Sequence, residues 1–221
     1  MSRCDAELKG RLFEWLNAQG LQRNQAITFL SDGGDTVREL PQGFTPQAEY
    51  LLDWFHLSMR LRTMGQLAKG VRAEAYPDLS ADLEEMLEHL KWNLWHGKVP
   101  RALEIVDELV YALDVEDASP EHRKLLKAVR AFETYITRNR ACIPNYGERY
   151  RQGKTIATSF VESAVNQVVS RRFVKKQQMR WTPSGAHLLL QIRAQVLNVE
   201  WRLTLARWYP GLQATPERKA A

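Results

Sequence analysis

The chain has 221 residues, of which 44% are hydrophobic and 26% charged, a balance typical of a globular protein that buries a core. No apolar run reaches the ~18–20 residues that cross a bilayer, and the polar start lacks a signal-peptide stretch, so a membrane-bound or secreted protein is not expected. Two distant cysteines, Cys4 and Cys142, exclude a disulfide framework and a Cys-x-x-Cys zinc site. The net charge of +5 is unevenly distributed, because basic residues dominate from Arg138 to Arg180 whereas residues 78–121 are acidic.

One helix and two short strands are predicted before residue 54. Apolar residues recur at three- and four-residue steps over residues 5–19, which predicts an amphipathic helix. Residues 26–30 are apolar and β-branched and end in the turn-forming segment 31–35, so a buried strand is expected. A short helix over 36–40 and a second strand over 48–53 follow.

The pattern from residue 55 onward is helical almost to the end of the chain. Ser119-Pro120 and Thr182-Pro183 each combine a good N-cap with a first-turn proline. Trp92 and Trp95 are expected in the core. Two strands do not make a stable sheet alone, so we expect the pair to need further strands. Helices are predicted over 55–69, 78–95, 100–113, 120–140, 158–173 and 183–208.

Three acidic residues are candidates for chemistry. Asp32 is expected at a strand end, followed by two glycines that allow close approach of a ligand; the alternative is a turn aspartate that binds its own backbone. Asp53 and His56 lie where a strand passes into a helix, so the histidine could orient a carboxylate, or the aspartate could simply cap the helix. Glu162 lies on an apolar helix, with Asn166 one turn later on the same face, which predicts a buried carboxylate that needs a partner or a metal.

A basic segment follows Glu162 directly. Residues 170–181 hold five cations, two amides and two aromatic rings without an acidic residue. This composition suits contacts with phosphates and stacking on bases, although a solvated basic helix end is the plainer interpretation. The predicted DNA-binding residues are Arg171, Arg172, Lys175, Lys176, Arg180 and Trp181.

The sequences of several segments resemble those of the DDE transposases of bacterial insertion sequences. The resemblance is strongest to the ISKra-type group, which is RNase H-like and Mutator-related. The resemblance covers nearly the whole chain. It rests on Ser-Asp-Gly-Gly at 31–34, Leu-Asp-Trp-Phe-His at 52–56, Trp-His-Gly-Lys at 95–98, Asn-Tyr-Gly-Glu-Arg-Tyr at 145–150, and the block from Phe160 to Pro183.

The resemblance implies an enzyme that cleaves DNA and transfers strands during transposition. In such enzymes three carboxylates hold two Mg²⁺ (or Mn²⁺) ions; the second matches Asp32 and the third Glu162, while Asp53 and His56 match an accessory Asp-x-x-His element. Asn166 is a further accessory candidate. The implied partners are DNA, as transposon ends and target, and further copies of the chain on that DNA. The implied location is the bacterial cytoplasm at the nucleoid, without a membrane.

The expected fold is an α/β catalytic fragment, a partial RNase H-like sheet of two strands with a large all-α insertion, and helical overall. We expect a partial catalytic core at 1–56, a helical insertion at 57–144, a catalytic-core helix with the basic segment at 145–181, and a C-terminal helix with a polar tail at 182–221. The first catalytic aspartate should lie on an earlier strand, and Asp5 lies on a helix instead. We therefore expect the C-terminal portion of such an enzyme, inactive alone.

Two alternatives stay open from the sequence. The chain could be a non-catalytic DNA-binding or oligomerising remnant of a transposase, to which Asp32 and Glu162 would be indifferent. It could also be an unrelated helical interaction protein with a basic patch, in which those two carboxylates would lie far apart.

Overall fold

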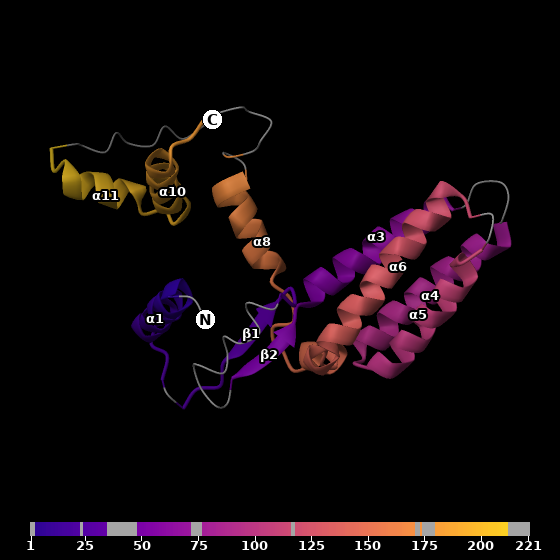
Figure 1. The fold of residues 1–221 in the computed structure, drawn as a ribbon. Helices are drawn as coiled ribbons and strands as arrows, with labels where there is room; N and C mark the ends of the chain where they lie inside the picture. The colour runs from indigo at the N-terminus through magenta and orange to yellow at the C-terminus, as the bar shows by residue number, and fades with distance from the viewer. Residues whose placement is uncertain are drawn as a thin grey trace, which may run out of the picture. The chain divides into compact units, whose positions relative to one another are not determined.

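The computed structural model describes residues 3–22, 24–34, 48–71, 77–115, 118–170, 173 and 180–211. The chain forms two compact units, residues 1–158 and residues 159–221. Figure 1 shows a mostly helical chain with one small sheet, which confirms the expectation of a helical protein with two strands. The short helix predicted over 36–40 lies outside the described residues, and the four-part division of the chain stays a prediction. Among the described helices, none combines the length and apolarity that a bilayer crossing requires.

The sheet consists of two parallel strands, β1 (Thr28–Ser31) and β2 (Glu49–Leu52). The register pairs the first residues of the two strands and, at the other end, Ser31 with Leu52. Because the strands are parallel, their carboxyl ends lie at the same edge. Asp32 and Asp53, each the residue after a strand, therefore both follow that edge.

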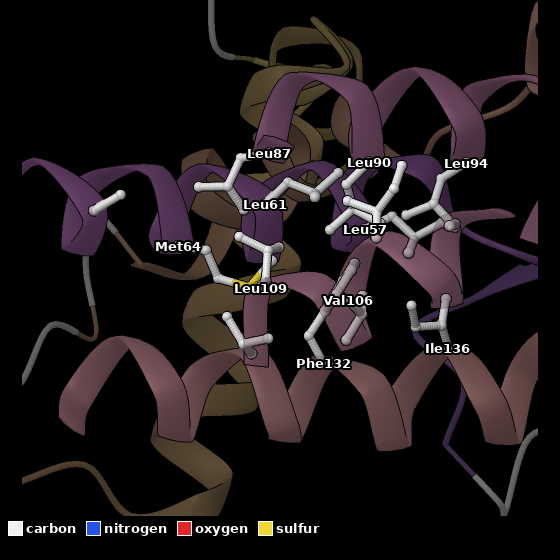
Figure 2. Packing of buried hydrophobic residues seen from close by; sticks show 14 of the residues in the cluster. Leu57, Leu61, Met64, Leu87, Leu90, Leu94, Val106, Leu109, Phe132 and Ile136 are labelled. Atoms are coloured by element: carbon white, nitrogen blue, oxygen red, sulfur yellow. The ribbon is translucent and has the colours of Figure 1, made fainter. Parts of the chain in front are cut away.

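Four helices pack beside one another in the first unit: α3 (Trp54–Gly70), α4 (Pro77–Trp95), α5 (Val99–Leu113) and α6 (Pro120–Asn139) (Figure 1). α3 contacts α4 and α6, and α5 contacts the same two helices, so the bundle closes on itself. Each helix has an apolar face at three- and four-residue steps, as its sequence pattern predicts. Figure 2 shows the core that these faces form, with side chains of Leu57, Leu61, Met64, Leu87, Leu90, Leu94, Val106, Leu109, Phe132 and Ile136.

The helix starts of the bundle follow the predicted capping chemistry. The Ser119 hydroxyl accepts a hydrogen bond of 3.3 Å from the His122 backbone N–H, and Pro120 opens α6. Gly97, with a positive φ of 69°, makes the turn between α4 and α5, where any side chain would meet the backbone of Pro144 and Asn145.

A short helix that the sequence did not predict, α7 (Tyr146–Arg151), closes the sheet end of the bundle. The Tyr146 side chain is fully buried, and its hydroxyl donates a 2.7 Å hydrogen bond to the carbonyl of Leu52. Its ring lies 4.9 Å from that of Trp54, which in turn lies 4.9 Å from that of Trp95. Three segments that are distant in sequence thus meet in one aromatic cluster at the end of β2.

The two tryptophans of α4 differ in their surroundings. Trp95 packs against the core as predicted, whereas the prediction for Trp92 is wrong, because its side chain is 47% exposed. The Trp92 indole N–H donates a 2.8 Å hydrogen bond to Glu88 on the preceding turn, so its ring lies along the outer face of the helix.

The second unit contains α8 (Ser159–Val165), the π-helical turn η3 (Asn166–Ser170), α10 (Pro183–Leu197) and α11 (Trp201–Trp208). The prediction of one helix over 183–208 is wrong. The chain breaks after Leu197, and Val199 takes a positive φ of 62°, which a right-handed helix cannot accommodate. Arg193 of α10 donates a 2.9 Å hydrogen bond to the carbonyl of Val168 and another to that of Gln167, which ties α10 to η3.

Candidate active site at the carboxyl end of the sheet

Asp32 lies in a tight turn directly after β1. Its Oδ1 accepts a 3.0 Å hydrogen bond from the backbone N–H of Gly34 and a 3.2 Å bond from the hydroxyl of Ser31. The Gly34 N–H is the main cause that holds the pKa of Asp32 below its ordinary value; partial burial opposes it, and Ser31 and the nearby His56 lower the pKa further. Asp32 is therefore both the turn aspartate of the plainer interpretation and an exposed, ionised carboxylate, as a ligand for a hard cation must be.

The Asp32 turn is also held from α6. The Tyr135 hydroxyl donates a 2.9 Å hydrogen bond to the backbone carbonyl of Asp32. The Asn139 side chain lies against the Cα of Gly33, close enough that a Cβ there would stand 2.8 Å from its Oδ1. The guanidinium of Arg60 lies 4.1 Å from the centre of the Tyr135 ring. Burial raises the pKa of Tyr135 to about 12, with the charge of Arg60 acting in the opposite direction.

Asp53 is fully buried and hydrogen bonded on several sides. Its Oδ1 accepts a 2.9 Å hydrogen bond from the backbone N–H of Phe55, which makes it the N-cap of α3. The carboxylate also accepts from the backbone N–H of Thr158, at 3.2 Å to Oδ1, and from the Thr158 hydroxyl. His56 Nε2 lies 3.8 Å from Asp53 Oδ2, and the His56 side chain is 33% exposed. The capping role proposed as an alternative from the sequence is thus present, and Asp53 also fastens the end of the first unit to the sheet.

Glu162 and Asn166 belong to the second unit. Glu162 is half-buried and Asn166, the first residue of η3, is exposed. No described residue of α8 is buried, so the expectation of a buried Glu162 carboxylate is wrong. The apolar residues around it instead lie near the surface: Phe160 is 66% exposed and Val165 45%. The convergence of Glu162 with Asp32 on one metal stays a prediction. Across the described part of the chain, no group of three or more His, Cys, Asp or Glu side chains is arranged as a metal-binding cluster.

Most of the predicted DNA-binding segment is outside the described residues, namely Arg171, Arg172, Lys175 and Lys176. Arg180 is exposed, and the Trp181 side chain is 37% exposed. The Trp181 ring packs edge-on against Phe173 at 5.3 Å between centroids. Trp181 is thus braced on one side while part of its ring stays open for stacking.

Sequence reasoning missed four residues of this site, and three of them, Tyr135, Asn139 and Thr158, come from distant segments. Tyr135 and Asn139 lie one turn apart on α6, Arg60 lies on α3, and Thr158 ends the first unit. One signal could have pointed to α6, because an amide and a tyrosine one turn apart interrupt an otherwise apolar face. No sequence pattern of this kind points to Arg60 or Thr158 as residues of the site.

Comparison of the chain with protein families, with curated proteins and with solved structures finds no match.

Proposed function

We propose that the chain is the C-terminal part of a DDE-type transposase of the ISKra-type group, and that it is incomplete as a catalyst by itself. The observation that most supports the proposal is the exposed, ionised Asp32 at the carboxyl end of a parallel strand pair, with Asp53 of the Asp-x-x-His element at the same edge. The two strands would belong to an RNase H-like sheet, and α3 to α6 to a helical insertion. The sequence motifs at 31–34, 52–56, 95–98 and 145–150 support the same family.

The Asp32 carboxylate fits a hard divalent cation, because it is exposed and its pKa is lowered by backbone and hydroxyl donors. Asp32 and Glu162 would hold Mg²⁺ or Mn²⁺ together with a third carboxylate. When bound, two such ions would activate the attacking oxygen and stabilise the leaving oxygen of an in-line displacement at phosphorus. His56, whose charge acts on Asp32, would steady the carboxylates at the sheet edge.

Arg180 and Trp181, with Arg171, Arg172, Lys175 and Lys176, would bind DNA. Cations next to an aromatic ring suit a nucleic-acid strand, because phosphates attract the cations and bases stack on the ring. DNA ends and target would be the substrates, and several copies of the chain would assemble on them in the bacterial cytoplasm.

Metal binding by the full chain tests this proposal. Isothermal titration with Mn²⁺ should show weak binding that Asp32→Asn or Glu162→Gln reduces about tenfold or more, in line with the effect of losing a metal partner. Asp107→Asn, an exposed carboxylate on α5, serves as the matched control and should leave the affinity unchanged. Strand joining with Mg²⁺ and labelled DNA should be absent. Robust joining by the chain alone would show that the active site is complete.

A non-catalytic DNA-binding remnant is the second candidate. It is favoured by the many protein donors that already occupy Asp53, and by the turn hydrogen bonds of Asp32, since both residues have structural roles without a metal. Under this alternative, Asp32→Asn and Glu162→Gln change neither Mn²⁺ affinity nor DNA binding. Substitution of Arg180 and Trp181 would still weaken DNA binding.

A further inference from the structure

The turn that carries Asp32 is attached to the helical bundle as well as to the strand that precedes it. Tyr135 donates to the Asp32 carbonyl at 2.9 Å, and the amide of Asn139 covers the Gly33 Cα. The two α6 residues are themselves joined, because Asn139 Nδ2 donates a 2.8 Å hydrogen bond to the carbonyl of Tyr135. The turn therefore meets a paired contact surface rather than one isolated side chain.

This contact surface is rigid because its neighbours are in the core. Phe132 and Ile136, on either side of Tyr135 in α6, are 1% and 0% exposed. Asn139 is 2% exposed, and Arg60 of α3 covers the Tyr135 ring. A side chain held by a packed helix and a second helix loses few rotamers when it binds the turn, so the contact orders the turn at a low entropic cost.

The conformation of the turn makes this contact specific. Gly33 has a φ of 88°, which a residue with a side chain rarely adopts. Its bare Cα lies where Asn139 approaches, so a Cβ at position 33 would force the Asn139 side chain to move. The bond from Tyr135 then fixes the peptide directly after Asp32.

We propose that Tyr135 and Asn139 are positioning residues, which order the Asp32 turn so that its carboxylate is presented in one orientation. The purpose of that orientation rests on the proposed function, in which Asp32 is a metal ligand, whereas the ordering of the turn does not. The helical bundle thereby contributes to the candidate site, because the orientation of the Asp32 carboxylate depends on residues of α6.

Hydrogen–deuterium exchange of the full chain tests the ordering directly. Tyr135→Phe keeps the ring under Arg60 and removes only the hydroxyl, and Asn139→Ala removes the cover of Gly33. Each variant should raise the exchange rate of the Gly33 and Gly34 amides about three- to tenfold, as the loss of one hydrogen bond or contact predicts. Tyr111→Phe is the matched control, because Tyr111 of α5 is 87% exposed, and it should leave exchange unchanged.

A purely structural role in the bundle gives a different result. If Tyr135 only stabilised the core, its loss would raise exchange throughout α5 and α6 together with the turn. That outcome, or unchanged exchange at Gly33 and Gly34 in both variants, overturns the proposal. Raised exchange confined to the turn supports it.

Paramagnetic broadening of the Gly33 and Gly34 amide resonances by Mn²⁺ separates this proposal from the proposed function. Tyr135→Phe should raise the Mn²⁺ concentration for half-maximal broadening several-fold, and Asp32→Asn should abolish the effect. If Asp32→Asn abolishes it but Tyr135→Phe and Asn139→Ala leave it as in the unsubstituted chain, the positioning role is overturned and the metal site stands. If Asp32→Asn leaves broadening unchanged, the proposed function fails, and the exchange rates alone still decide whether α6 orders the turn.

Discussion

At the scale of single residues, the conformation of the Asp32 turn strongly favours glycine at position 33. Gly33 combines a positive φ of 88° with an approach by Asn139 that leaves no room for a Cβ. Either condition alone disfavours a side chain, and together they make one costly. The sequence predicts that the two glycines after Asp32 leave room for a ligand, whereas at Gly33 the Asn139 side chain of α6 occupies that room.

Gly33→Ala should destabilise the first unit by about 1–3 kcal/mol, because the new Cβ meets Asn139 and the backbone is strained. Urea unfolding at neutral pH measures this difference. Gly65→Ala in α3 is the control: nothing lies within 4 Å of a Cβ at that helical position, so it should be neutral or stabilise by about 0.5–1 kcal/mol. Equal stability of Gly33→Ala and the unsubstituted chain would contradict the geometry of the turn.

The raised pKa of Tyr135 predicts a specific loss of stability at high pH. Burial lifts the pKa of Tyr135 to about 12 in the folded chain, above the value near 10 expected when unfolded. The stability that the raised pKa of Tyr135 contributes is therefore complete below about pH 10, where Tyr135 is protonated in the folded and the unfolded chain. It is lost as the pH rises toward about 12. Its size should be about 1 kcal/mol after allowance for partial exposure.

The measurement is the free energy of unfolding of the unsubstituted chain and of Tyr135→Phe between pH 9 and 12. The difference between the two should shift in favour of Tyr135→Phe over that interval, because phenylalanine has no proton to lose. Tyr111→Phe, at an exposed position, should show no such shift. A constant difference for Tyr135→Phe across the interval would show that the hydroxyl is not desolvated.

At the scale of elements, Asp53 joins β2 and α3 to a segment that lies about 100 residues later in the chain. It directly follows β2, caps α3 and accepts hydrogen bonds from the backbone N–H and the hydroxyl of Thr158. The backbone N–H of Trp54 also donates to the carbonyl of Ile156 at 3.1 Å. Residues 156–158 are thus hydrogen bonded to the residues at the carboxyl end of β2, and α8 begins at the next residue of the chain. The Asp-x-x-His element is, in this chain, a structural junction as well as a candidate accessory to catalysis.

Asp53→Ala should cost about 2–4 kcal/mol, because it removes a helix cap and leaves the half-buried donors of Thr158 without their carboxylate acceptor. Ser119→Ala, which removes the cap of α6 and the 2.9 Å hydrogen bond between the Ser119 hydroxyl and His122 Nδ1, should cost about 1 kcal/mol and is the comparison. Limited proteolysis should also become faster around residues 154–160 in Asp53→Ala only. Equal losses of stability in the two variants would mean that the bonds to Thr158 contribute nothing.

At the scale of the whole molecule, stability is concentrated in the first unit. Its core is a single cluster that includes side chains from all four bundle helices and from β2, while no described residue of the second unit is buried. The apolar residues of α10 are examples, since Leu188 is 59% exposed and Val196 52%. A substitution should therefore matter according to the unit in which it lies.

Leu109→Ala, at a fully buried position of α5, should cost about 2–5 kcal/mol and shift the unfolding of the whole bundle. Leu188→Ala should change stability by less than about 0.5 kcal/mol, since its side chain is exposed. Thermal unfolding followed by circular dichroism compares them. A large loss in Leu188→Ala would indicate that α10 is covered by a partner in solution.

The sequence by itself determined the elements whose causes are local. Apolar periodicity gives the four bundle helices, Ser119 and Thr182 give helix starts, and apolar runs that end in turn or helix-start residues give both strands with Asp32 and Asp53 after them. Tertiary structure alone decided the partners: Tyr135 and Asn139 on the Asp32 turn, Thr158 on Asp53, and the exposure of Trp92. Local patterns depend on neighbours within one or two turns. The contacts of Tyr135, Asn139 and Thr158 instead join residues about 100 positions apart and depend on how the bundle closes against the sheet edge.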